Sequence, residues 1–383
     1  MTFHGIVRIV LSILLISSAY AGQLEKLYDP PVTVNEWVVA DGRPLYIAGD
    51  ARYVNVLGDA LGPRYLEGSE LSMKLSPGAN YRLISLLQPM DQIKDGMRYT
   101  DHYVYDHEDQ LAYTITRGSG ADLKAAVAAI SDEGTLALVD PINATVAFYR
   151  GGSLLAETQL YRTEGDHSLE RKAFIKWVGS YLHILIERPG RGGAGPQNAI
   201  KIKIDTEGRN QTTTLLPFTY LLDHVFEEDR HVVSGYSYQA SSGEFAPQIM
   251  ELDASGRTLW TNENFGHELA LSADGSYLAA RKSHAAVIVF DLEKGRVEEV
   301  EFRKEGKVAL GLAVTNRGNI SLIRVDPDFF VKKSSHHAEV FFPRSGSSTS
   351  VQLNPNLPAM FKIHSDGHRF LLGSQYEWLE IRE

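Results

Sequence analysis

The stretch Ser272–Gly295, SADGSYLAARKSHAAVIVFDLEKG, contains the pattern that decides the fold. A tight turn leads into the apolar run YLAARKS, a polar break follows, and a second apolar run, AAVIVFDLE, ends at a Gly. Both runs are short and bounded by Gly, Ser or Asp, which predicts two antiparallel strands. With HELALSAD before them and RVEEVEFR after them, the stretch predicts one four-stranded unit, with strands a to d in chain order.

The same unit recurs along the chain. AAVAAIS, TLALVDP, INATVAFYR and SLLAETQLY repeat it in the same order. Further copies occupy residues 173–216, 218–265 and 308–353, and a copy with three strands ends the chain at residues 360–383. The turns between strands a and b contain Gly134, Gly179, Gly275, Gly318 and Gly367. A period of about 40 to 50 residues is typical of β-propeller blades.

SADGSYLAA followed by VIVFDLEKG resembles the bacterial β-propellers of the WD40-like and YVTN-like superfamily. In WD40 repeats a Trp-Asp pair ends strand c, whereas Phe290-Asp291 stands at that place in this chain. The resemblance therefore implies an all-β β-propeller fold and carries over no functional residue.

The repeats predict six blades, or seven if residues 80–110 form another. The last copy lacks a fourth strand, and LAYTITR, Leu111–Arg117, is the expected donor, so that a strand from nearer the N-terminus closes the ring and removes exposed sheet edges. The short apolar runs before residue 96 do not recur with the period of the blades. They predict a small all-β domain at residues 22–95, with a β-sandwich at residues 52–87, before a propeller at residues 96–383.

The N-terminus has the pattern of an export signal. Arg8 precedes the apolar run Ile9–Ile16, and Ala19-Tyr20-Ala21 fits the small-x-small pattern of a cleavage site. The run is too short to span a bilayer, so a cleaved signal peptide at residues 1–21 is favoured over an uncleaved anchor. With no Cys for a lipid anchor, we expect a periplasmic or secreted, monomeric protein without a membrane span.

Composition narrows the possible chemistry. A formal charge of -10 and a pI near 5.7 disfavour nucleic acid and anionic membranes as partners, because an acidic surface repels both. The absence of cysteine excludes thiol nucleophiles, iron–sulfur clusters and Cys-ligated zinc. No cofactor, catalytic residue or metal site is predicted.

The breaks between strands b and c predict a binding face. Three of them are long, Arg188–Asn198, Gln239–Gln248 and Asp326–His337, while the a–b and c–d turns are minimal. Long loops on one rim of a rigid scaffold are typical recognition sites. We expect this rim to bind a protein, a peptide or an envelope polymer. The candidate binding residues are Phe329, Phe330, Lys332, Lys333, Phe245 and Arg191.

Two alternatives remain open at the level of sequence. The phenylalanines of these loops could instead plug the mouth of the channel and the lysines could simply be solvated. The chain could also be a metal-dependent propeller hydrolase or lactonase with a site in the axial channel. That enzyme would need inward-facing carboxylates or His, for which the candidates are Glu170, Asp223, His267 and Glu268.

Overall fold

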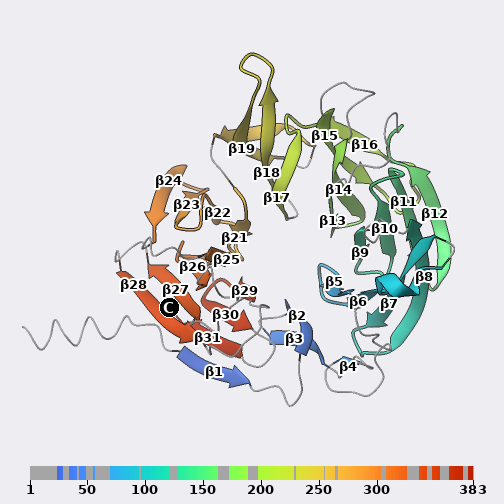
Figure 1. Cartoon of the computed structure of the whole chain (residues 1–383), viewed down its shortest axis with the longest axis horizontal. Coiled ribbons are helices and arrows are strands. Elements are labelled where there is room, and N and C mark those ends of the chain that lie inside the picture. Colours follow the sequence, from blue (N-terminus) through green and yellow to red (C-terminus); the bar gives the residue numbers. More distant parts are fainter. Residues whose placement is uncertain are drawn as a thin grey trace, which may run out of the picture. The chain divides into compact units, whose positions relative to one another are not determined.

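The computed structural model describes residues 24–28, 34–40, 43–48, 55–56, 70–94, 96–120, 127–162, 172–188, 197–227, 230–253, 255–263, 266–302, 308–325, 336–342, 347–353, 362–373 and 378–382. They form strands β1 to β31 and one short 3-10 helix, η1 (Met90–Gln92). The chain divides into two compact units, residues 32–267 and residues 1–31 with 268–383. Figure 1 shows the strand labels.

The unit at residues 32–267 contains one three-stranded and four four-stranded antiparallel sheets among its described residues. The three-stranded sheet holds β2 (Val34–Ala40), β3 (Arg43–Ala48) and β4 (Asn55–Val56). Next along the chain come β5 (Glu70–Leu75), β6 (Tyr81–Leu87), β7 (Met97–Asp106) and β8 (Leu111–Gly120), then β9 (Val127–Ile130), β10 (Leu136–Asp140), β11 (Thr145–Arg150) and β12 (Ser153–Gln159). The last two sheets hold β13 (Ala173–Val178), β14 (Tyr181–Arg188), β15 (Gln197–Ile204) and β16 (Thr212–Leu215), and β17 (Tyr220–Phe226), β18 (His231–Gln239), β19 (Glu244–Leu252) and β20 (Thr258–Asn262).

The other unit contains three four-stranded sheets in its described part. Two follow chain order: β21 (Leu269–Leu271), β22 (Tyr277–Arg281), β23 (Ala286–Asp291) and β24 (Arg296–Glu301), then β25 (Val308–Val314), β26 (Ile320–Val325), β27 (His336–Phe342) and β28 (Ser347–Leu353). The third has the order β1-β31-β30-β29 and holds β1 (Leu24–Tyr28), β29 (Lys362–Ser365), β30 (Arg369–Gly373) and β31 (Trp378–Arg382).

The opening stretch forms the sheet that its pattern predicts, in the order β21-β22-β23-β24. Gly275, in the turn between β21 and β22, has a φ of 72°, a conformation that glycine adopts without steric cost. The Ser272 hydroxyl accepts a hydrogen bond from the Tyr277 amide at 2.9 Å and so closes the same turn. Gly295 has a φ of 63° between β23 and β24. The predicted strand order and turn chemistry are confirmed for this unit.

The predicted donor of the last sheet's fourth strand is wrong. Leu111–Arg117 lies in β8 and pairs with β7 of its own sheet, while β1 pairs antiparallel with β31, Leu24 opposite Ile381. The short turn before β8 favours this local pairing, because a short loop costs little closure entropy. Asp106 stabilises that turn by accepting hydrogen bonds from the Glu108 and Gln110 amides.

The segment assigned to a separate N-terminal domain does not form one sheet or sandwich in the described residues. β4 joins β2 and β3, whereas β5 and β6 pair onward with β7. Pairing of Tyr81 in β6 with Asp106 in β7 crosses the boundary placed near residue 95. Residues 70–120 thus contribute a four-stranded sheet beyond the six repeats counted from the sequence, and the described part of the chain holds seven such sheets. The segment predicted as a signal peptide lies outside the described residues.

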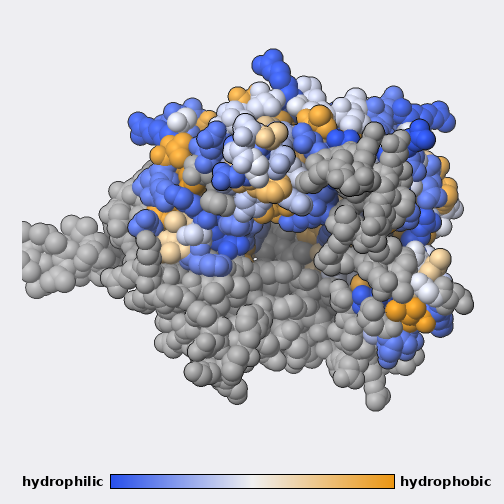
Figure 2. Space-filling model, turned by 45° about the horizontal axis from the view of Figure 1, so that its top comes forward, coloured by the Kyte–Doolittle hydropathy of each residue, from blue (hydrophilic) through white to orange (hydrophobic). Residues whose placement is uncertain are grey.

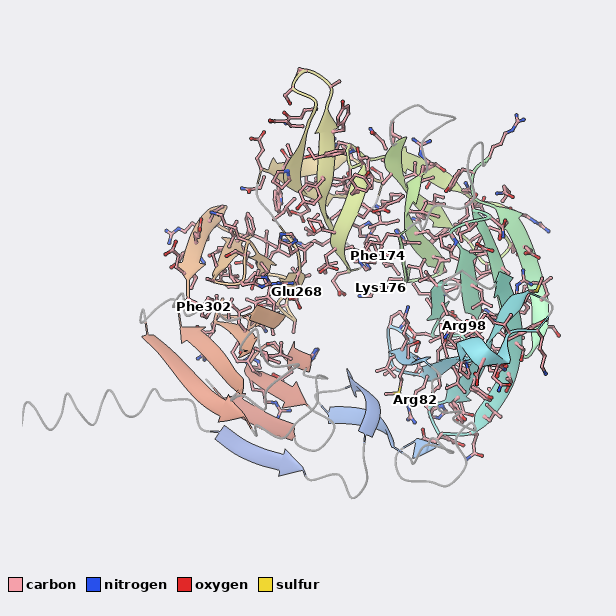
Figure 3. All side chains as sticks on the ribbon, viewed as in Figure 1. Arg82, Arg98, Phe174, Lys176, Glu268 and Phe302 are labelled. Carbon is pink, nitrogen blue, oxygen red and sulfur yellow. The ribbon has the colours of Figure 1, made fainter. Side chains whose placement is uncertain are left out.

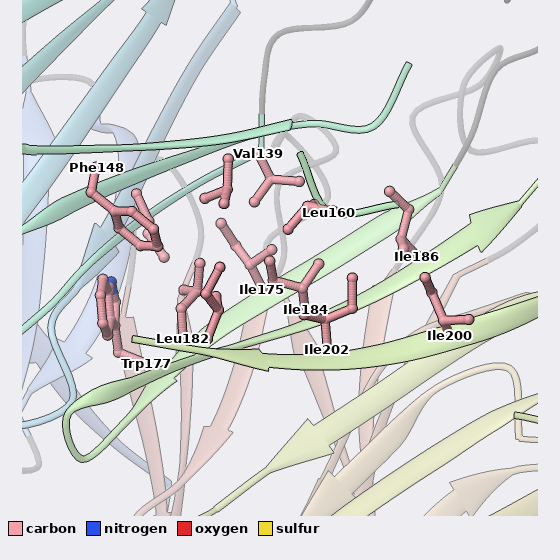
Figure 4. Packing of buried hydrophobic residues seen from close by; sticks show 14 residues of the cluster. Val139, Phe148, Leu160, Ile175, Trp177, Leu182, Ile184, Ile186, Ile200 and Ile202 are labelled. Atoms are coloured by element: carbon pink, nitrogen blue, oxygen red, sulfur yellow. The ribbon is translucent and has the colours of Figure 1, made fainter. Parts of the chain in front are cut away.

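The core of the unit at residues 32–267 is clearest between the sheets β9–β12 and β13–β16. Figure 4 shows the fourteen buried residues of this cluster. Phe148 and Trp177 meet with ring centroids 5.9 Å apart. The remaining members are aliphatic and come from both sheets: Ala129, Ala137, Val139, Val146, Leu160, Ile175, Leu182, Ile184, Ile186, Ile200, Ile202 and Ile204. Strands of a sheet that is covered on both faces read as apolar runs, and further clusters cover the other faces of these two sheets, which explains the composition of the strands.

The surface carries both apolar and hydrophilic side chains. On the face that Figure 2 shows, apolar residues lie in separate small groups among hydrophilic ones. In the part of the chain that the structure describes, no helix has the length and apolar content needed to cross a membrane.

Candidate binding surface

The hairpin β18–β19 extends beyond its neighbours in the sheet β17–β20. β17 pairs with β18 only as far as Tyr236, and β20 pairs with β19 only from Ile249 onward. β18 and β19 nevertheless continue to pair until Gln239 meets Glu244. The last part of the hairpin is therefore two-stranded, at the end of the sheet where strands b and c are joined.

Three aromatic side chains gather on this hairpin and the adjacent end of β17. Tyr220, Tyr238 and Phe245, here named the aromatic platform, are 46%, 49% and 43% exposed. The Phe245 ring lies between the two tyrosines, with centroids 5.4 Å from Tyr220 and 5.2 Å from Tyr238. The rings are tilted by 51° and 52° instead of lying flat on one another. Tilted neighbours of this kind leave ring faces and edges open to solvent.

Strand register explains why these residues meet. Tyr238 and Phe245 are directly opposite each other, so their side chains emerge on the same face. Tyr220 pairs with Tyr236, which lies two residues before Tyr238 and therefore on that face as well. Ser237 and Gln248 alternate with these residues and so lie on the opposite face, where the Ser237 hydroxyl donates a hydrogen bond to the Gln248 side-chain oxygen at 3.3 Å.

Large aromatic side chains left half exposed and in contact with one another are a productive surface for association. Burying them removes apolar area from water, at about 25 cal/mol per Å². Tyrosine adds a hydroxyl that hydrogen-bonds at low cost in conformational entropy, which is one reason why it is enriched at binding hot spots. The aromatic platform can thus anchor a partner without any covalent chemistry.

The structure describes only one residue of the predicted binding set. Phe245 is described and exposed, although it lies in a strand and not in a loop. The prediction of a loop at Gln239–Gln248 is therefore wrong in its length. Gln239 belongs to β18 and residues 244–248 belong to β19, so that only residues 240–243 connect the two strands. The other candidates, Arg191, Phe329, Phe330, Lys332 and Lys333, lie outside the described residues.

Sequence reasoning missed Tyr220 and Tyr238. The segment YSYQ in β18 alternates aromatic and polar residues, which is the available signal that Tyr236 and Tyr238 share a face. Which residue of β19 stands opposite Tyr238 depends on the register of the hairpin. The assumed ten-residue loop hid that register.

The residues proposed for an axial enzyme site are engaged in structural contacts where the structure describes them. Glu268, labelled in Figure 3, accepts hydrogen bonds from Arg281 Nε and from the Leu312 amide, both at 3.1 Å. Asp223 lies 3.8 Å from His224 Nδ1. His267 is exposed and Glu170 lies outside the described residues. In the described part of the chain no group of three or more His, Asp or Glu is placed to hold a metal ion.

No protein-family model matches this sequence, and no curated protein matches it either. Several solved structures do. BamB from Moraxella catarrhalis is 11% identical with a TM-score of 0.55, covering 94% of this chain and 100% of its own. A structure described as the eukaryotic initiation factor is 11% identical with a TM-score of 0.51, covering 88% and 92%. The mitotic checkpoint complex contains a chain that is 12% identical with a TM-score of 0.50, covering 83% and 89%.

These likenesses agree with the sheets described above. The structural neighbours are β-propeller proteins. Consecutive four-stranded antiparallel sheets, each built from successive strands, are the elements of that architecture. At this level of identity the comparison speaks for the fold and not for an activity. The chain is an all-β protein of the β-propeller fold.

Proposed function

We propose that this chain is an exported, non-catalytic β-propeller that binds a protein or peptide partner through the rim formed by its b–c connections. The observation that carries the proposal is the aromatic platform, three half-exposed rings in mutual contact at the b–c end of one sheet. Exposed aromatic clusters on a rigid sheet are characteristic of interaction surfaces. Two structural neighbours come from the mitotic checkpoint complex and from a eukaryotic initiation factor. The first of these names denotes an assembly of proteins, which agrees with a protein partner.

The opposite end of the same sheet supplies a matched control. Leu259, at the start of β20, is 50% exposed and follows the turn between strands c and d. Its side chain is about as exposed as those of the aromatic platform and is also apolar, but it lies at the end of the sheet where strands c and d are joined. A binding partner of the b–c rim should therefore contact position 245 and leave position 259 free.

Site-specific photo-crosslinking tests this geometry. A benzophenone amino acid replaces Phe245, Tyr238 or Leu259, one at a time, and the native host is illuminated. We expect the same discrete adduct from positions 238 and 245 and none from position 259. Equal adducts from all three positions, or adducts from position 259 alone, would contradict a b–c binding rim.

A peptide library displayed on phage gives a second test that does not depend on the host. We expect selected peptides to lose at least about tenfold in affinity with Phe245→Ala, since removing a hot-spot aromatic costs about 2 kcal/mol or more and about 1.4 kcal/mol is already tenfold. Affinity should be unchanged with Leu259→Ala. Selected peptides that bind both variants equally would show that the aromatic platform is not the anchor.

The hydrolase alternative makes a different prediction. An ion bound only by the folded form must raise the melting temperature. A clear rise with Ca²⁺, Mn²⁺ or Zn²⁺ would favour an axial metal site over a purely binding role.

A further inference from the structure

The two faces of the sheet β13–β16 differ in chemistry, because one is aliphatic and the other combines apolar residues with a row of Lys and His. Ile175, Ile184 and Ile202 form one cross-strand row, and this row packs into the aliphatic core shared with β9–β12. The next row consists of Lys176, His183 and Lys203. Because successive residues of a strand point to opposite faces, this second row faces away from β9–β12. It meets the sheet β17–β20, and we name this contact the polar seam.

Lysines of one sheet bind carbonyls of the other across the polar seam. Lys176 Nζ donates to the Phe226 carbonyl at 2.5 Å and to Glu227 Oε1 at 2.9 Å. Lys201 Nζ donates to the Asp253 carbonyl at 3.3 Å. Figure 3 marks Lys176 and Phe174 on β13. The seam thus holds a set of fixed positive charges next to apolar contacts of Phe226 and its neighbours.

A pair of histidines lies within this seam. His183 in β14 and His231 in β18 meet edge to face with ring centroids 4.6 Å apart, and they are 2% and 0% exposed. His183 Nδ1 and both ring nitrogens of His231 are buried without a hydrogen-bond partner. Phe226 packs against both rings, 6.0 Å from His183 and 5.1 Å from His231. No acceptor therefore stands ready to stabilise an added proton on His231.

The charges around the pair are mainly positive. Lys201 and Lys203 from β15 act on both imidazoles, and Lys176 from β13 acts on His231. The acid that opposes them at His231 is Asp253, which follows β19. Nearby on β17, His224 lies 4.9 Å from the Phe226 ring and has Asp223 at 3.8 Å, with Lys74, Lys172 and Lys176 as its cationic neighbours.

We infer that the polar seam is an acid-sensitive contact, closed while His183 and His231 are neutral and opened when protons bind them. A proton on either ring creates a buried charge beside a second imidazole and several lysines. On His231 neither ring nitrogen has a hydrogen-bond partner, and the attraction of Asp253 is opposed by Lys201 and Lys203. Opening the seam brings both rings into water, where the charged form is solvated. The aliphatic contact on the other face of the same sheet contains no titrating group and has no such response.

The size of the effect follows from proton linkage. Burial, followed by the repulsion of neighbouring cationic groups, lowers the pKa of His183 to about 3 and that of His231 to about 4. A solvated histidine titrates near 6.5. The open form therefore binds more protons than the closed form between pH 6.5 and about 4, and acid shifts the equilibrium toward opening. At pH 5, protonation of each histidine shifts the equilibrium between the closed and open forms about 30-fold toward the open form.

Hydrogen exchange of the full chain, followed by mass spectrometry at pH 7.5 and pH 5.0 and corrected for the intrinsic rate, reports the opening. We expect amides of β14 and β18 to lose at least about 30-fold in protection in acid. Amides of β10 and β11, behind the aliphatic core, should keep theirs. Equal losses in both regions mean global acid unfolding and overturn the inference, as does unchanged protection in β14 and β18.

Variants locate the response. His183→Leu with His231→Leu removes the buried pair, and the acid-induced loss of protection in β14 and β18 should then shrink to the part that His224 contributes. Replacing buried polar groups that lack partners by apolar ones is compatible with folding. If the double variant does not fold, His231→Gln alone should reduce the acid effect by about 30-fold. His107→Leu, at a side chain that is 71% exposed, is the matched control and should behave as the wild type. An undiminished acid effect in the histidine variants overturns the inference.

Discussion

Gly235 in β18 shows how little space the hairpin leaves at its base. A Cβ at this position would lie 2.4 Å from the Tyr220 carbonyl oxygen and 2.8 Å from the Phe218 ring. Neither group can move freely, because Tyr220 belongs to β17 and the Phe218 ring is fully buried. We expect Gly235→Ala to destabilise the fold by about 2–3 kcal/mol, a typical cost of overpacking, as measured by urea unfolding.

Gly243 gives the contrasting case in the same hairpin. It has a φ of 73°, and nothing lies within 4 Å of the Cβ that alanine would add. Gly243→Ala should therefore cost only the backbone strain of a left-handed conformation, about 1 kcal/mol. If the two substitutions have the same cost, close packing between β17 and β18 is not what selects glycine at position 235.

At the scale of elements, the sheet β13–β16 is stabilised by different physics on its two faces. Ile184 is fully buried in the aliphatic core that the sheet shares with β9–β12. We expect Ile184→Ala to lower the free energy of unfolding by about 2–5 kcal/mol, because it leaves a cavity that close-packed neighbours cannot fill. Urea unfolding at pH 7.5 and pH 5.0 should give the same loss, since no titrating group belongs to that core.

Leu215 in β16 is the control for this prediction. It belongs to the same sheet but is 61% exposed, so Leu215→Ala should change the free energy of unfolding by no more than about 0.5 kcal/mol. A loss at Ile184 that grows or vanishes in acid would mean that the two faces of the sheet do not act independently.

For the whole molecule, buried histidines set the dependence of stability on pH. His102 in β7 is fully buried, and burial is the main cause that lowers its pKa to about 4. Burial likewise lowers the pKa of His183 to about 3 and of His231 to about 4. The unfolded chain then binds more protons than the folded one below pH 6.5, so stability is complete above that pH and is lost as the pH falls toward about 4.

We expect each of these three histidines to remove on the order of 2 kcal/mol at pH 5 relative to pH 7.5. The urea midpoint should therefore fall over this interval, and His102→Gln should recover part of the loss without restoring protection in the polar seam. A midpoint that is the same at both values of pH would contradict the burial of neutral histidines.

Local sequence patterns predict much of this architecture correctly. The repeated strand-turn-strand units, the positive φ of Gly275 and the apolar composition of strands such as β23 follow from residues that are close in sequence. The aromatic platform could be predicted only in part. Phe245 was identified because it lies in one of the long b–c breaks, but its contacts with Tyr220 and Tyr238 depend on a hairpin register that the pattern does not specify.

By itself the sequence determined the class of fold, because short apolar runs separated by tight glycine turns can bury their side chains only as stacked antiparallel sheets. Tertiary structure alone decided that β1 completes the last sheet, that β8 stays with β7, and that His183 meets His231. These outcomes depend on contacts between segments that are distant along the chain. Their free energy comes from the fit of complete surfaces, which no local pattern of residues records.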